Sequence, residues 1–172
     1  DGSFDVTVGE GAASTVYSSR KVILATGHSA RDTYAMLMKN SFSLAVKPFS
    51  VGVRIEHLQS DIDRSLYGEQ TGHPSLPVGE YGLSAKFNGR GVYSFCMCPG
   101  GTVVAAASEE NGVVVNGMSE YARDGENSNA ALLIGIEPDH FGSDHPLAGI
   151  ELQRKIEKTA FELGGGDYSA PC

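Results

Sequence analysis

The chain has 172 residues, a formal net charge of −8 and 20% charged residues, which suits one soluble domain or a domain with an appendage. Its lysine and arginine residues do not cluster, and no run approaches the roughly 20 apolar residues of a membrane-spanning helix, so we expect neither a nucleic-acid nor a membrane partner. Three cysteines form an odd set and no signal-peptide pattern is visible, which favours reduced thiols in a cytoplasmic protein.

The N-terminal part predicts a small meander followed by a strand, a turn and a helix. Two short alternating stretches surround a glycine-rich turn within residues 3–18, and the apolar run at residues 22–25 predicts a strand buried on both faces. Ser29 is expected to cap the following helix, and Asp32 lies in its first turn, where the helix dipole favours a negative charge. Such a unit can bind an anion or a nucleotide through free backbone N–H groups, although many of these units bind nothing.

The middle of the chain predicts a change of domain. Helical spacing ends near residue 39, and Lys47-Pro48 disfavours both a helix and a central strand, so we place a domain boundary near residue 45. Residues 50–56 alternate as a strand that carries Arg54 on the face opposite its branched apolar side chains. Arg54 is a candidate contact for an anion or a flavin edge; a surface pair with Glu56 or a cross-strand salt bridge is the alternative.

The rest of the chain predicts an α+β fold, with a mixed or antiparallel sheet and helices packed against it. Its last helix should bury Leu152, Ile156, Thr159, Ala160 and Leu163, and a glycine run should end it. The expected elements, in chain order, are a helix over 59–67, a long loop over 68–82, a hairpin over 83–98 turning at Asn88-Gly89, strands over 102–107 and 113–115, a turn at Asn116-Gly117, a strand over 130–136 and a helix over 150–163.

The string from Cys96 to Gly101 contains the strongest candidates for reactive side chains, two thiols beside a glycine turn. Its cysteines lie two apart on an expected strand, so their thiols should point the same way. A thiol at a strand end beside a glycine turn is a weak candidate for a redox or nucleophilic group if its pKa is lowered, and a small inert thiol is the alternative. No second pair of cysteines or helical pair of histidines completes a four-ligand site, so we expect no metal.

Several strings resemble those of a family of largely uncharacterised bacterial FAD-dependent dehydrogenases. The run at residues 22–27 is similar to the second dinucleotide motif of two-domain flavoproteins. The longer strings are more specific, and together they cover nearly the whole chain: Ala25–Thr33, Lys47–His57, Tyr93–Gly101, Asn116–Ser119, Pro146–Glu151 and Ala160–Tyr168.

The resemblance implies an internal piece of an FAD-dependent oxidoreductase. Residues 1–44 would be a remnant of the FAD-binding domain, and residues 45–172 an inserted substrate or cap domain. Redox chemistry on an unidentified small molecule would take place at the flavin. By resemblance the cofactor contacts are Ala25, Thr26, Gly27 and His28, and the pocket candidates are Arg54, Cys98, Pro99, Gly100, Gly101 and Asn116.

The FAD fingerprint glycines and the returning FAD-domain segment of the family are not in this chain. We therefore expect the parent protein to bind FAD and the fragment alone not to retain it. An exposed FAD-domain remnant could also pair with a second copy through its open strand edge. Two other interpretations stay open, a stand-alone non-catalytic interaction domain and an enzyme that uses the thiol of Cys96 or Cys98.

Overall fold

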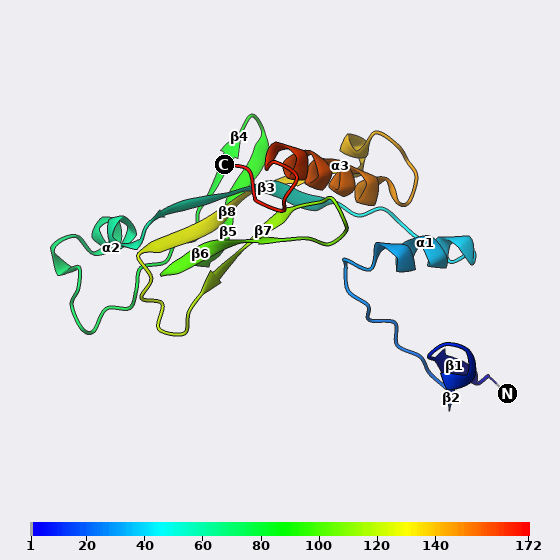
Figure 1. Ribbon diagram of the computed structural model, residues 1–172. Helices are drawn as coiled ribbons and strands as arrows, with labels where there is room; N and C mark the ends of the chain where they lie inside the picture. The colour runs from blue at the N-terminus through cyan, green and yellow to red at the C-terminus, as the bar shows by residue number, and fades with distance from the viewer. Residues whose placement is uncertain (1) are drawn as a thin grey trace.

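The computed structural model describes residues 2–172, so Asp1, the first residue of the predicted N-terminal domain, lies outside the described part (Figure 1). Over residues 2–172 the fold is α+β, as predicted, with antiparallel sheets and three α-helices. The elements are β1 (Phe4–Val8), β2 (Thr15–Ser19), α1 (Arg31–Lys39), β3 (Phe49–Leu58), α2 (Gln59–Tyr67), β4 (Ser84–Phe87), β5 (Arg90–Cys98), β6 (Gly101–Ala106), β7 (Val114–Ser119), β8 (Asn127–Ile136) and α3 (Ala148–Leu163).

A four-stranded sheet in the order β3-β8-β5-β4 forms the centre of the molecule. Its neighbouring strands are all antiparallel, which decides between the mixed and antiparallel alternatives. β3 and β8 pair along their full length, from Phe49 opposite Ile136 to Leu58 opposite Asn127. β8 therefore begins earlier than the strand predicted at residue 130, because the polar residues at its start complete the ladder with β3.

The turn between β4 and β5 has the backbone that its sequence predicts. Asn88 has a φ of 48° and Gly89 a φ of 79°, so both central residues are left-handed. Two left-handed residues characterise the tight hairpin turn whose twist matches that of the flanking strands.

β6 and β7 form a separate hairpin that lies against the central sheet. The turn predicted at Asn116-Gly117 is wrong, because both residues lie within β7, opposite Val104 and Val103 of β6. Gly117 allows β7 to approach the side chains of the central sheet closely and does not form a turn. A Cβ atom there would lie 2.1 Å from Oδ1 of Asn129, so only glycine lets β7 pack this closely over β8.

The small apolar core lies where α3 begins. Phe141 and Ala148 pack with Ile136 at the end of β8, and Phe49 of β3 stacks on Phe141 with ring centroids 5.2 Å apart. The buried stripe predicted along the rest of α3 is partly wrong. Ile156 and Thr159 are exposed and Leu163 is 74% exposed, whereas Glu157 is buried. The second half of α3 faces charged groups instead of the core, as described below.

The β1–β2 hairpin lies apart from the rest of the chain, and an extended segment joins it to α1 (Figure 1). The strand predicted at residues 22–25 is wrong for this chain, because the segment pairs with no strand of residues 2–172 and Ile23 is 89% exposed. A buried strand needs hydrogen-bonding neighbours and covered faces, and the described residues provide neither.

The N-terminus of α1 also differs in one detail from the prediction. Asp32 lies in its first turn as expected, but Ala30 is the N-cap residue and no side chain caps the helix. The hydroxyl of Ser29 contacts Nδ1 of His28 and Oγ of Ser108 instead, each at 3.2 Å. No helix within residues 2–172 has the length and apolar character needed to span a bilayer.

Replacing Gly89 by alanine should destabilise the chain by about 1–2 kcal/mol, the cost of a left-handed backbone for a residue with a Cβ atom. No heavy atom lies within 4 Å of a Cβ built on Gly89 or on Gly91, and only Gly89 has a positive φ. Gly91→Ala is therefore the matched control and should change the stability little. Urea unfolding of both variants measures the difference, and equal losses would contradict the assigned turn.

Candidate functional site

A cavity of about 240 Å³ lies between the N-terminal segment and the start of α3. His28, Tyr34 and residues 44–47 line one side, and the stacked pair Phe49 and Phe141 lies on the other with residues of α3. Its walls are mostly apolar, with a few polar side chains, among them His28 and Gln153. An apolar cavity with few polar groups is the usual form of a small-molecule site.

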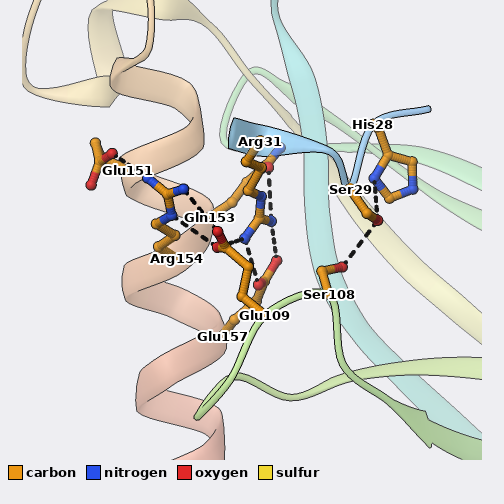
Figure 2. Close-up of polar contacts among 9 residues, drawn as sticks. All are labelled: His28, Ser29, Arg31, Ser108, Glu109, Glu151, Gln153, Arg154 and Glu157. Carbon is orange, nitrogen blue, oxygen red and sulfur yellow. Dashed lines mark hydrogen bonds and ion pairs between the residues drawn. The ribbon is translucent and has the colours of Figure 1, made fainter. Parts of the chain in front are cut away.

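Arg31 joins the two sides of this cavity through a buried ion-pair network, shown in Figure 2. The residue is 3% exposed, and its guanidinium grips Glu157 of α3 with Nη2 to Oε1 at 2.6 Å and Nη1 to Oε2 at 2.9 Å. Nη1 also donates to Oε2 of Glu109 at 2.7 Å, and Nη2 to Oε1 of Gln153 at 3.1 Å. α1 is thereby held to α3 and to the loop between β6 and β7.

Arg154 extends this network along α3. Its Nε and Nη2 each donate to a carboxylate oxygen of Glu109 at 2.8 Å, and its Nη1 reaches Glu151 at 2.7 Å. The hydrogen bonds from Arg154, and after them those from Arg31, lower the pKa of Glu109 from its ordinary value of 4.5 to about 2. The hydrogen bond to Glu157 raises the pKa of Arg31 despite its burial.

No role for Arg31 follows from the sequence alone, although the residue lies within the string Ala25–Thr33 that resembles the flavoprotein family. One signal was present. Arg31 opens α1, where the positive end of the helix dipole disfavours a cation. An arginine at that position implies carboxylate partners from elsewhere in the fold, but the sequence does not show that they come from α3.

The predicted cofactor residues lie in the segment before α1. Ala25, Thr26 and Gly27 are exposed and line no part of the cavity, whereas His28 lines it. Gly27 has a φ of 80°, and no heavy atom lies within 4 Å of where its Cβ would be. The structure thus leaves the face of this turn open.

A second cluster forms around Arg54 of β3. Its Nη1 donates to Oδ1 of Asn129 at 2.6 Å and to the carbonyl of Cys96 at 3.0 Å. The alternative ion pair with Glu56 is wrong, because Glu56 instead accepts hydrogen bonds from the Asn127 side chain at 2.5 Å and the Val103 backbone at 3.4 Å. Arg54 has no carboxylate partner within residues 2–172.

The two strand cysteines are not equivalent. A register shift between Phe95 and Cys98 breaks the alternation of β5, and Cys96 has a φ of 44°. The expected common direction of the thiols depended on regular alternation, which this bulge interrupts. Cys96 is exposed and Cys98 half-buried, both thiols are free, and Cys98 Sγ donates to the Cys96 carbonyl at 3.4 Å.

The remaining pocket candidates do not line the cavity beside His28. Pro99, Gly100 and Gly101 form a buried turn in which the Gly100 N–H donates to Oε1 of Gln59 at 2.9 Å. A Cβ on Gly100 would lie 2.1 Å from the carbonyl oxygen of Arg123, so the turn is packed against backbone. Asn116 is exposed on β7, next to the glycine that covers the Arg54 cluster.

One hydrogen-bonded chain was not predicted. Ser128 Oγ contacts Nδ1 of His57 at 2.8 Å, and Nε2 of His57 contacts the hydroxyl of Tyr81 at 2.7 Å. Ser128 is fully buried, so its hydroxyl is not placed to attack a substrate, and burial raises the pKa of Tyr81. These hydrogen bonds hold the loop over residues 68–82, through Tyr81, against the central sheet.

Residues 48–172 match the family model described as "FAD-dependent protein, C-terminal domain-like". The chain belongs to this FAD-dependent protein family. It is also 53% identical over 153 residues to an uncharacterized protein of Clostridium beijerinckii, an alignment that covers 87% of this chain and 28% of that relative. The chain thus spans less than a third of the length of this relative.

The residues of this FAD-dependent family member do not by themselves fit FAD. The cavity beside His28 is smaller than the roughly 300–1,000 Å³ of ordinary small-molecule sites. Ala25, Thr26 and Gly27 lie outside its lining and are exposed.

Replacing Arg31 by methionine should cost about 3–5 kcal/mol, because it leaves the carboxylate of Glu157 buried without its partner. Urea unfolding measures the loss, and faster tryptic cleavage near Lys39 should report that α1 has detached from α3. Arg123→Met is the control, since the exposed Arg123–Glu80 pair at 3.5 Å should contribute less than about 1 kcal/mol. Similar losses in both variants would contradict the role given to Arg31.

The acid sensitivity of the fold should depend on Glu109. Its folded-state pKa lies below its ordinary value, so its contribution is present above pH 4.5 and is lost as the pH falls through about 2. Wild type should therefore be more stable than Glu109→Gln at pH 6, and the gap should close as the pH approaches 2. Urea unfolding at a series of pH values checks this, and a constant gap would show that the carboxylate charge is not responsible.

Proposed function

We propose that this chain is the substrate or cap domain of an FAD-dependent oxidoreductase, joined to a segment of its FAD-binding domain. The observation that carries the proposal is that the N-terminal part leaves large apolar side chains exposed to solvent. Phe4 and Tyr17 of the hairpin and Ile23 of the extended segment turn their side chains to solvent. A second body that covers these residues would give them the burial that their composition requires.

The family membership supports a cofactor domain as that second body. The matched family model is described as a C-terminal domain, and the aligned part covers 28% of the relative, which leaves room for a separate cofactor domain there. Arg31 fixes α1 to the C-terminal part, so a cofactor domain that pairs with residues 22–29 would be held at a set distance from the cavity beside His28. This geometry suits a domain that closes over a flavin.

In such a protein the flavin carries out the redox step, and the protein supplies binding, orientation and exclusion of water. The apolar walls around Phe49 and Phe141 suit the last two tasks. A dehydrogenase acting on a small organic molecule is the reaction class that the sequence resemblance favours.

A flavin titration tests the proposal on this chain and on the whole protein side by side. We expect only the whole protein to bind FAD, in a 1:1 ratio, because the chain alone carries one edge of the site. Absorbance and fluorescence of the bound flavin give the stoichiometry. A whole protein without flavin would favour the stand-alone interaction domain, and flavin bound by the chain alone would show that the site is complete here.

Gly27→Val in the whole protein should reduce bound FAD at least about tenfold, since a side chain would occupy the open face of this turn. Gly72→Val is the matched control. Gly72 has nearly the same φ, 83° against 80°, and likewise has no heavy atom within 4 Å of a built Cβ. Equal losses of FAD in both variants would mean that backbone strain alone is responsible.

A further inference from the structure

We propose that the cavity beside His28 binds a small aromatic carboxylate, a single ring that carries one acidic group. The ligand would be a substrate class for the domain proposed above, and that biological meaning rests on the proposed function. The binding itself involves only residues of this chain that line the cavity, and it needs no flavin.

The size and the walls of the cavity suit one aromatic ring. Its volume of about 240 Å³ exceeds the roughly 150 Å³ of an apolar cavity that holds benzene, and it lies below the roughly 300 Å³ at which drug-sized sites begin. Phe49 and Phe141, stacked with ring centroids 5.2 Å apart, line one side, and Tyr34 lines the other. Aromatic walls favour an aromatic ligand, because offset and edge-on ring contacts stabilise beyond the burial of apolar area.

The backbone of α3 holds the two phenylalanine rings in place. A Cβ on Gly149, in the first turn of α3, would lie 3.2 Å from Cε1 of Phe49 and 3.3 Å from Cε2 of Phe141. Both rings therefore pack directly against the helix, and the wall that they form exists without a ligand. A preformed wall has little side-chain freedom to lose when a ligand binds.

Gln153 gives the cavity a hydrogen-bond donor of fixed orientation. Its Oε1 accepts from Nη2 of Arg31 at 3.1 Å, and a guanidinium can only donate, so the amide cannot be turned the other way (Figure 2). Nε2 has no partner within residues 2–172 and is not among the buried nitrogen and oxygen atoms that lack one, so it keeps accessible surface. Because Gln153 lines the cavity, this nitrogen is available to an acceptor oxygen of a ligand there.

The charge around the cavity favours an acid over a base. No aspartate or glutamate is among the described residues that line it, whereas Lys47 lines it and makes no ion pair within residues 2–172. A carboxylate can accept from both the ammonium group of Lys47 and the amide of Gln153. A basic ligand would find no counter-charge on these walls.

Benzoate titration of the isotope-labelled chain, followed by NMR at constant ionic strength, tests the proposal. The ring signals of Phe49 and Phe141 and the side-chain amide signals of Gln153 should shift and saturate together. Benzoate should bind at least about tenfold more tightly than acetate, which has the same acidic group but no ring to bury. It should also bind more tightly than cyclohexanecarboxylate, whose ring has a similar size but is not aromatic.

Gln153→Glu tests the amide donor. The variant keeps an oxygen for Arg31 and adds a charge to that contact, so the fold is maintained, but it replaces the donor in the cavity by an acidic oxygen. Benzoate binding should weaken at least about tenfold. Gln70→Glu is the matched control, since Gln70 is exposed and its side chain makes no contact within residues 2–172, and it should bind benzoate as wild type does.

Lys47→Gln tests the charge independently. It should weaken benzoate binding about two- to fivefold, as expected for an exposed cation, and leave the binding of uncharged benzyl alcohol unchanged.

The proposal is overturned if Gln153→Glu binds benzoate as wild type does, or if acetate or cyclohexanecarboxylate binds as tightly as benzoate. It is also overturned if benzoate leaves the signals of Phe49, Phe141 and Gln153 unmoved. None of these outcomes depends on whether the whole protein holds FAD, so the two proposals fail separately.

Discussion

The buried guanidinium of Arg31 determines how the N-terminal segment sits on the rest of this protein. Its contacts with Glu157 and Glu109 cross from α1 to α3 and to the β6–β7 loop (Figure 2). A buried arginine is tolerated only where carboxylates compensate its charge, and each of these carboxylates in turn needs the arginine. The ion pairs therefore favour one position of α1 on α3, the position in which these charges are paired. Apolar contacts alone would specify this position less sharply.

This docking creates the cavity beside His28. The cavity walls come from both sides of the predicted boundary near residue 45, so neither side forms it alone. The same docking leaves the hairpin and the segment before α1 without a partner, and their apolar side chains face solvent. The chain is thus held together by ion pairs at one interface and exposes apolar side chains at another.

Arg31 and Arg54 differ in the partners of their guanidinium groups. Arg31 uses both terminal nitrogens on acidic partners and holds the structure together. Arg54 uses a single nitrogen, on neutral oxygens, and keeps its remaining edge without a protein acceptor. Nε of both arginines is buried without an acceptor within residues 2–172, so the two differ in their carboxylate partners and not in unpaired donors.

Much of the fold followed from local patterns in the sequence. The presence of strand β3, the bounds of α2 and the Asn88-Gly89 turn were predicted correctly, because spacing and turn chemistry act over a few residues. The strand at residues 22–25, the turn at Asn116-Gly117 and the apolar stripe of α3 were not, since each depends on what lies opposite. Residues 22–25 have no partner strand here, Gly117 admits Asn129, and α3 turns Glu157 inward to meet Arg31.

The sequence by itself determined the helices and most strands of the C-terminal part, the α+β class and the resemblance to FAD-dependent proteins, which the family match then supported. Only the tertiary structure decided which charges are paired and where the cavity lies. Ion pairs such as Arg31 with Glu157 join residues 126 positions apart. No local pattern encodes such a distance, because the energy of the pair exists only once the fold has brought both groups out of water together.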